Sequence, residues 1–561
     1  MPKLFINSKS YFFIIFVALL LAIILKRITI GIDLADESYY ASFLDDWLKD
    51  GLKNSANLMI HQTAELLLFP FAYTYQSVVG SETGLILFLR VIYTLLSFGA
   101  MLSLYFFIKP QQGQLIGAMV FAFGVLFIPW GLPAPSYNTL GMYGIVAAIS
   151  LFAIAMLHAQ EKKKLGAMPS FFSAFFWTLS IFAYPSLVIA FGGFIAIAYI
   201  FLKERRVLIP YLLLFSFFSL CSLIFLSLIL GGEHLIEIFK FSNAMLHLSS
   251  VSTKFHNIMQ VFQNPIFTIL CLISLIMGGM VAVYSCLIFL AELFIAGALI
   301  YLTFFSQPTL FLASHDLIFI IALLGIFIPI NALKPMADSS DCLVGIMYCS
   351  SFFAGMVTTI TASNGLFNFP VGGLLAACLT LAFLHRNLEK RAYVFVLILS
   401  SICMGVISCN NFYGEMYGNP LGMPNQKINK GIFAGLITSK PQANFIYKMI
   451  ALLPQERTGK KVLVFGRLSA LYLLTSLSPA ALSTWNYSDV QDSAVSRMIS
   501  NFYQKKKNQP YLILDYRDPW GLPLAKTEKT LLKEYEMRGK YKAEIQSVAI
   551  YQKAGQFLAS P

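Results

Sequence analysis

The stretch Asp33-Leu34-Ala35-Asp36-Glu37-Ser38-Tyr39-Tyr40 follows the first apolar run of the chain. That run, from Tyr11 to Leu25, would form about 22 Å of helix, whereas a hydrocarbon core about 30 Å thick needs roughly 20 residues. The membrane span is therefore predicted to continue to Ile32. This places the acidic pair Asp36 and Glu37 just outside the membrane, at the level of the lipid head groups.

The residues after the acidic pair have helical periodicity. Tyr39, Phe43 and Trp47 fall on one stripe, whereas Asp45 and Lys49 fall on the opposite face. A helix with one aromatic and one charged face is predicted to lie in the membrane interface and not to cross it. The acidic pair would then be fixed between two anchored helices.

Composition indicates a polytopic α-helical membrane protein. The 561 residues are 58% hydrophobic and 12% charged, and the mean hydropathy is +0.72. The net charge of +13 does not indicate nucleic acid as a partner, because the basic clusters between apolar runs report topology. The eight cysteines form neither a disulfide framework nor a CxxC metal pair.

The apolar runs predict about thirteen transmembrane helices within residues 1–409, with an external loop at 33–83. The run from Phe171 to Leu202 is too long for one helix, and Tyr184-Pro185 is expected to interrupt it. If the N-terminus is cytoplasmic, every later basic cluster between spans falls on the cytoplasmic side. The acidic pair, a polar loop at 233–264 and the C-terminal tail would then be external.

Residues 410–561 are predicted to form a small extracytoplasmic α/β domain. Hydrophobicity falls after residue 409, and a mixed pattern follows. We expect strands at Lys461–Phe465, Tyr511–Asp515 and Val548–Gln552, and helices at Leu468–Ser476 and Thr527–Arg538. No glycine-rich nucleotide motif follows the first of these strands.

Together, Asp36, Glu37, Tyr39, Tyr40 and the overall plan resemble the GT-C superfamily of membrane glycosyltransferases. The resemblance is to the bacterial aminoarabinose transferase and protein O-mannosyltransferase branch, and the tail matches no family. A Trp-Trp-Asp motif is missing, so en bloc transfer to asparagine is not expected. Membership would imply a polyprenyl-phosphate-linked sugar donor and inverting transfer at the external face of the bacterial cytoplasmic membrane.

The chemistry of such a transfer suits the residues present. A carboxylate must accept the proton of the attacking hydroxyl, and either Asp36 or Glu37 is the expected base. Cations must bind the leaving lipid phosphate, and Lys26, Arg27 and Arg90 are the candidates. Tyr39, Tyr40, Tyr137, Asn138 and Asn364 are expected to line the substrate cleft. The acceptor would be a lipid, glycan or protein of the cell envelope, such as lipopolysaccharide.

Other interpretations stay open at this point. Asp36 could cap the amphipathic helix, and Lys26 and Arg27 could extend to the interface without binding a ligand. A lipid-linked-sugar flippase or transporter, or a non-catalytic envelope-assembly scaffold, would have similar composition. No metal site is predicted, and the sequence leaves open the need for a cofactor or divalent metal, the sugar, the acceptor and the oligomeric state.

Overall fold

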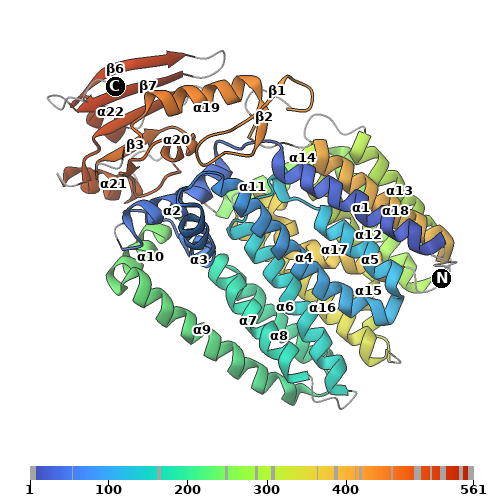
Figure 1. The fold of residues 1–561 in the computed structure, drawn as a ribbon. Helices are drawn as coiled ribbons and strands as arrows, with labels where there is room; N and C mark the ends of the chain where they lie inside the picture. Colours follow the sequence, from blue (N-terminus) through green and yellow to red (C-terminus); the bar gives the residue numbers. More distant parts are fainter. Residues whose placement is uncertain are drawn as a thin grey trace, which may run out of the picture. The chain divides into compact units, whose positions relative to one another are not determined.

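A computed structural model describes most of the chain (Figure 1). The described residues are 8–553 apart from 54, 161–165, 247–250, 285–287, 305–309, 336, 363, 385–389, 411, 413, 416–419, 457–458, 486–493, 506–507, 518–525 and 543–546. The chain divides into two compact units. Unit 1 contains residues 1–30, 90–219 and 252–411, and unit 2 contains residues 31–89, 220–251 and 412–561.

Unit 1 is built from helices. They are α1 (Ser8–Thr29), α5 (Gln114–Leu126), α6 (Tyr137–Gln160), α7 (Ala167–Ala183), α8 (Leu187–Phe201), α11 (Val251–Val261), α12 (Pro265–Val283), α13 (Ile288–Phe304), α14 (Leu310–Leu324), α15 (Phe327–Ala332), α16 (Ser339–Thr361), α17 (Phe369–Phe383) and α18 (Lys390–Asn410). Helices α4 (Leu85–Gln112) and α9 (Leu208–Leu230) cross the boundary between the units. Short 3-10 turns lie at Pro129–Gly131, Arg205–Val207 and Gly365–Asn368.

The helices include candidate membrane spans. In the described part of the chain, seven helical segments are long and apolar enough to cross a bilayer, and five further apolar helices are shorter. The predicted interruption at Tyr184-Pro185 is confirmed, because α7 ends at Ala183 and α8 begins at Leu187. A membrane protein with many helices is therefore what this part of the chain forms.

Helix α17 is the most buried span, with 94% of the span window that contains it inside the protein. Small residues allow this, because a Cβ atom on Gly372 would lie 2.2 Å from backbone atoms of Ala354 and Gly355 in α16. Close approach of backbones at small residues is a common way to pack helices in membranes. Helix α9 is the opposite extreme, because only 6% of its window is buried.

Unit 2 combines the acidic segment with the C-terminal residues. Its helices are α2 (Asp36–Asp50), α3 (Gln62–Val79), α10 (Gly232–Leu246), α19 (Lys440–Leu452), α20 (Ala470–Leu473), α21 (Ala494–Gln504) and α22 (Lys526–Leu532). Its strands are β1 (Asn425–Lys427), β2 (Ile437–Ser439), β3 (Lys461–Phe465), β4 (Ser478–Pro479), β5 (Leu512–Arg517), β6 (Tyr535–Lys542) and β7 (Ser547–Lys553).

The described strands form two sheets. Strands β1 and β2 make an antiparallel pair, and a five-stranded sheet has the order β4-β3-β5-β7-β6. Strand β3 runs parallel to β4 and β5, whereas β7 is antiparallel to β5 and β6. Helix α19 lies beside this sheet (Figure 1), where Phe445 packs against Tyr541 with ring centroids 6.0 Å apart.

The structure corrects several details of the tail. Strand β3 has the predicted bounds, and β5 and β7 lie within two residues of theirs. The helix predicted at Thr527–Arg538 is wrong in its second half, because α22 ends at Leu532 and β6 begins at Tyr535. In β6 the charged residues Glu536, Arg538, Lys540 and Lys542 stand at every second position, which is the period of a strand. The helix predicted at Leu468–Ser476 is shortened to α20.

Two predictions about external segments are also wrong. The residues from Glu37 to Trp47 of α2 are all buried, including the charged face that was expected to meet water. On this face Lys49 and Asp45 form an ion pair inside unit 2, and the position of α2 relative to a membrane stays a prediction. The segment predicted as a polar loop at 233–264 contains α10 and α11.

Candidate functional site

Asp33 organises the start of α2. Its Oδ1 accepts a hydrogen bond from the backbone N–H of Ala35 at 2.8 Å, and its Oδ2 accepts one from Glu37 at 2.9 Å. The hydroxyl of Ser38 donates to the carbonyl of Asp33 at 2.8 Å. Asp33 therefore satisfies backbone donors of the first turn, which is the capping role that the sequence left open for Asp36.

The acidic pair lies on the first turn of α2. Glu37 is buried and Asp36 is half-buried. Burial raises the pKa of Asp33 well above its usual value, and the nearby charge of Asp36 raises it further, against the two backbone donors. The neutral form of Asp33 is thus favoured beside Asp36. Three carboxyl groups therefore lie at one helix start, and the pKa of one of them, Asp33, is raised.

The C-terminal part of unit 2 holds the backbone just before this turn. The N–H of Ile32 donates to Glu415 Oε1 at 2.9 Å, and Gln442 Nε2 donates to the carbonyl of Ile32 at 2.7 Å. The N–H of Ala470 donates to the carbonyl of Leu34 at 3.0 Å. Burial raises the pKa of Glu415, whereas its hydrogen bonds from Thr438 and Ile32 oppose that shift. The acidic turn is therefore fixed by residues far away in the sequence.

Aromatic side chains surround the predicted cleft residues Tyr39 and Tyr40, which are both buried. The ring of Tyr39 lies 5.5 Å from Trp485 and 5.4 Å from Tyr40. Its hydroxyl is 3.0 Å from His61 Nδ1. Burial lowers the pKa of His61 to about 4. This imidazole is therefore neutral at physiological pH and can accept a hydrogen bond.

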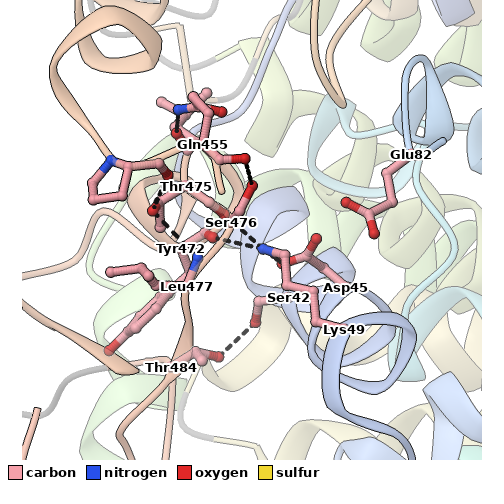
Figure 2. A network of polar contacts seen from close by, with 12 residues as sticks. Ser42, Asp45, Lys49, Glu82, Gln455, Tyr472, Thr475, Ser476, Leu477 and Thr484 are labelled. Carbon is pink, nitrogen blue, oxygen red and sulfur yellow. Dashed lines mark hydrogen bonds and ion pairs between the residues drawn. The ribbon is translucent and has the colours of Figure 1, made fainter. Parts of the chain in front are cut away.

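A polar network anchors α2 along its far end (Figure 2). Lys49 Nζ lies 2.6 Å from Asp45 Oδ2, with only 3% and 1% of the two side chains exposed. The same Nζ donates to the carbonyl of Thr475 at 2.7 Å, and Ser42 and Thr484 share a hydrogen bond of 2.7 Å. Burial raises the pKa of Asp45 to about 7 in spite of the charge of Lys49.

The predicted phosphate-binding residues belong to unit 1. The guanidinium groups of Arg27 and Arg90 are buried, with 2% and 1% of the residues exposed, whereas Lys26 is exposed. Arg90 Nη1 donates to the carbonyl of Ile28 at 3.0 Å, and Arg27 Nη1 donates to that of Ile30 at 2.9 Å. The structure therefore brings the two arginines together at the end of α1.

A strained turn lies against Arg27. Arg27 Nη2 donates to the carbonyl of Gly131, and the neighbouring Trp130 has a φ of 53°, a region that a bulky residue rarely adopts. The backbone N–H of Trp130 donates to His315 Nε2 at 3.3 Å, and the two rings are 5.0 Å apart. His315 was not predicted. Its signal in the sequence is the polar triplet Ser314-His315-Asp316 within an apolar run.

The three remaining cleft residues also lie in unit 1. Tyr137 stacks on Tyr184 with ring centroids 5.3 Å apart. Asn138 is buried at the start of α6, and its Oδ1 has no hydrogen-bond partner among the described residues. Asn364 is exposed before the turn Gly365–Asn368. A buried amide oxygen of this kind is a candidate acceptor for a ligand hydroxyl.

The predicted site residues thus form two groups. Asp36, Glu37, Tyr39 and Tyr40 lie on α2 of unit 2, and the predicted basic and amide residues lie in unit 1. Sequence reasoning missed Asp33 as the cap, Glu415 and Gln442 as supports, and His61. The supports carry no local signal, because they act through backbone groups hundreds of residues away.

Comparisons with known proteins give a distant likeness. No protein-family model matches the chain, and no curated protein matches it. Among solved structures, the chain is similar to the archaeal oligosaccharyltransferase AglB from Archaeoglobus fulgidus, in complex with an inhibitory peptide and a dolichol-phosphate. The identity is 12%, the match covers 96% of this chain and 74% of that chain, and the TM-score is 0.49. This likeness assigns no family to the chain.

Proposed function

We propose that this protein is a membrane glycosyltransferase of the GT-C type. It would transfer a monosaccharide from a polyprenyl-phosphate-linked donor to a cell-envelope acceptor at the external face of the bacterial cytoplasmic membrane. The observation that carries the proposal is the acidic pair Asp36–Glu37, which starts a buried helix next to Asp33, whose carboxylate accepts hydrogen bonds from the backbone of Ala35 and Glu37.

In this proposal one carboxylate of the pair acts as general base. The acceptor oxygen attacks the anomeric carbon as the bond from that carbon to the phosphate oxygen breaks, which inverts the configuration. The hydroxyl proton passes to the carboxylate, and the lipid phosphate leaves with the bonding electron pair. Burial and the charge of Asp36 both raise the pKa of Asp33, which favours a single negative charge on these two neighbouring carboxyl groups.

The charge of the departing phosphate needs cations. We assign this role to Arg27 and Arg90, with Lys26 as an exposed third cation. Guanidinium groups bind phosphate oxygens through parallel hydrogen bonds and keep their charge when buried. Asn138, whose buried Oδ1 has no partner among the described residues, is assigned to a substrate hydroxyl.

The test is sugar transfer from a labelled polyprenyl-phosphate donor in membranes that contain equal amounts of each variant. We expect transfer to fall by about 10²–10⁴-fold in Asp36→Asn or Glu37→Gln, as for loss of a general base. Asp50→Asn, at the other end of α2, is the matched control and should keep transfer. Full transfer in both acidic variants would remove the pair from the reaction.

A transporter is the second candidate, and one observation favours it. Both carboxyl oxygens of Glu292 in α13 are buried without a hydrogen-bond partner among the described residues. Buried carboxyl groups inside membrane helices often lie on a substrate or proton path. If Glu292→Gln abolished movement of the lipid-linked sugar while Asp36→Asn had no effect on any labelled product, transport would replace transfer as the function.

A further inference from the structure

A continuous basic segment lies between the last apolar helix and the five-stranded sheet. From Leu421 to Gln455 the chain has no aspartate or glutamate. Its four lysines, Lys427, Lys430, Lys440 and Lys448, are all exposed. We call these four residues the basic surface. A cluster of exposed positive charges attracts polyanions, and such a cluster is unusual on a surface that meets only water.

The backbone brings the four lysines together. Lys427 ends β1, and Lys440 follows β2, which pairs with β1 in the register Asn425 opposite Ser439. The N–H of Lys440 donates to the carbonyl of Pro424 at 2.8 Å. Helix α19 lies beside β1 and β2 in Figure 1, so the four lysines belong to neighbouring parts of the β1–β2 hairpin and α19.

Tyr447 links the helix to the hairpin. Its hydroxyl accepts a hydrogen bond from the N–H of Asn429 at 3.0 Å and donates one to the carbonyl of Lys427 at 3.3 Å. Lys448 is the next residue on the helix. The lysines therefore keep a fixed spacing, and no ion pair involves them in the part of the chain that the structure describes.

Backbone hydrogen bonds place the hairpin at the end of a membrane span. The N–H of Gly84 donates to the carbonyl of Gly431 at 3.1 Å, and the N–H of Ile86 donates to that of Ile432 at 3.3 Å. Helix α4, a candidate span, begins at Leu85. Lys430 is thus one residue from a contact with the first turn of a span, where lipid head groups begin.

Apolar side chains accompany the lysines. Leu452 is exposed and follows Lys448 by four residues, so both lie on one face of α19. Leu421, before β1, is exposed as well. Lysines beside exposed leucines are the composition of a surface that contacts a membrane, where the charges meet phosphates and the leucines enter the interface.

We infer that the basic surface binds the anionic head groups of the phospholipid bilayer that α4 spans. The partner is a phosphodiester lipid such as phosphatidylglycerol, recognised by charge. The inference does not depend on glycosyl transfer. If the inference is right, the C-terminal part of unit 2 is attached to the membrane in two ways: through the chain connection to α18 and through the basic surface.

The experiment compares the full chain in nanodiscs of phosphatidylcholine alone and in nanodiscs that also contain phosphatidylglycerol. The readout is hydrogen–deuterium exchange of peptides from residues 425–452, at low and high salt. We expect slower exchange with phosphatidylglycerol at low salt only. Each lysine near an anionic surface changes binding by about five-fold, so the quadruple Lys→Gln variant of the basic surface should lose this protection.

The matched control replaces four exposed lysines elsewhere in unit 2, Lys505, Lys529, Lys533 and Lys540, with glutamine. It carries the same change in net charge and should keep the protection. Equal exchange in both nanodiscs for the unchanged protein would overturn the inference, and so would equal loss in both quadruple variants. Protection by a soluble anionic glycan in phosphatidylcholine nanodiscs would show a different partner and overturn it too.

Discussion

Lys49→Met is expected to destabilise unit 2 strongly because it breaks a buried ion pair. Lys49 Nζ contacts Asp45 Oδ2 at 2.6 Å and the carbonyl of Thr475 at 2.7 Å, and both charged side chains are almost fully buried (Figure 2). Asp45 Oδ1 has no hydrogen-bond partner among the described residues. Removing one member of such a pair leaves an uncompensated charge and costs about 3–5 kcal/mol.

The loss of stability in Lys49→Met should depend on pH because of Asp45. The pKa of Asp45 in the folded protein is about 7, against a usual value of 3.8. The folded protein therefore keeps this proton where the unfolded chain has released it, so the free energy of unfolding falls as the pH rises from about 4 to 7. Lys49 lowers this pKa, and its removal raises it. Near pH 5 the acid is neutral in both proteins, and the variant loses only its charged hydrogen bonds to carbonyls, about 1.5–3 kcal/mol.

Thermal unfolding of the full chain in detergent, followed at pH 5 and pH 9, measures this difference. A domain of 150–250 residues shifts by roughly 2–4 °C per kcal/mol, so Lys49→Met should lower the Tm by roughly 6–20 °C at pH 9 and by less at pH 5. Lys53→Met removes an exposed lysine just after α2 and should have almost no effect. A decrease in Tm that is equal at both pH values, or no larger than that of Lys53→Met, would refute the role of the buried pair.

Three further variants test separate parts of the structure. Gly372→Ala would place a Cβ atom 2.2 Å from the backbone of α16 and should lower the free energy of unfolding by about 1–3 kcal/mol or more. Gly279→Ala is the control, because its Cβ atom meets open space, and it should leave the Tm unchanged. His61 has its pKa lowered to about 4, so the free energy of unfolding should fall as the pH decreases from 6.5 to 4, and His61→Gln should remove that part of the pH profile. Gln442→Leu leaves the buried carbonyl of Ile32 without its 2.7 Å donor; unfolding should become easier by about 1–3 kcal/mol, and the rate constant of sugar transfer should fall more than the affinity for the donor.

The helical part of the fold could be predicted from the sequence because hydrophobic runs have a direct physical cause. A bilayer requires long apolar helices, and proline interrupts them, as at Tyr184-Pro185. The position of the acidic pair at the start of a helix was predicted from the helical periodicity of Tyr39, Phe43 and Trp47. Strand β3 could be found because its apolar residues stand between polar turns.

Other features depend on partners that the local pattern does not contain. The charges on α2 suggested a face in water, but Lys49 finds the carbonyl of Thr475, 426 residues away. Burial of such a face could not be predicted from periodicity alone. The stretch from Thr530 to Arg538 contains the end of α22 and the start of β6. So short a stretch matches either a helix or a strand, and the pairing of β6 with β7 decides the outcome.

The C-terminal residues carry no motif, yet they hydrogen-bond to the backbone just before the acidic turn. The backbone of residues 31–34 bonds to Ile437, Glu415, Gln442 and Ala470. If the tail were a separate binding module, ending the chain at residue 411 would leave transfer intact. In the structure that truncation removes these hydrogen bonds, each worth about 0.5–1.5 kcal/mol, and exposes the buried faces of α2. We therefore expect the truncated chain to lose transfer even when it inserts normally into membranes, and full transfer by that chain would show that the acidic turn orders itself without the tail.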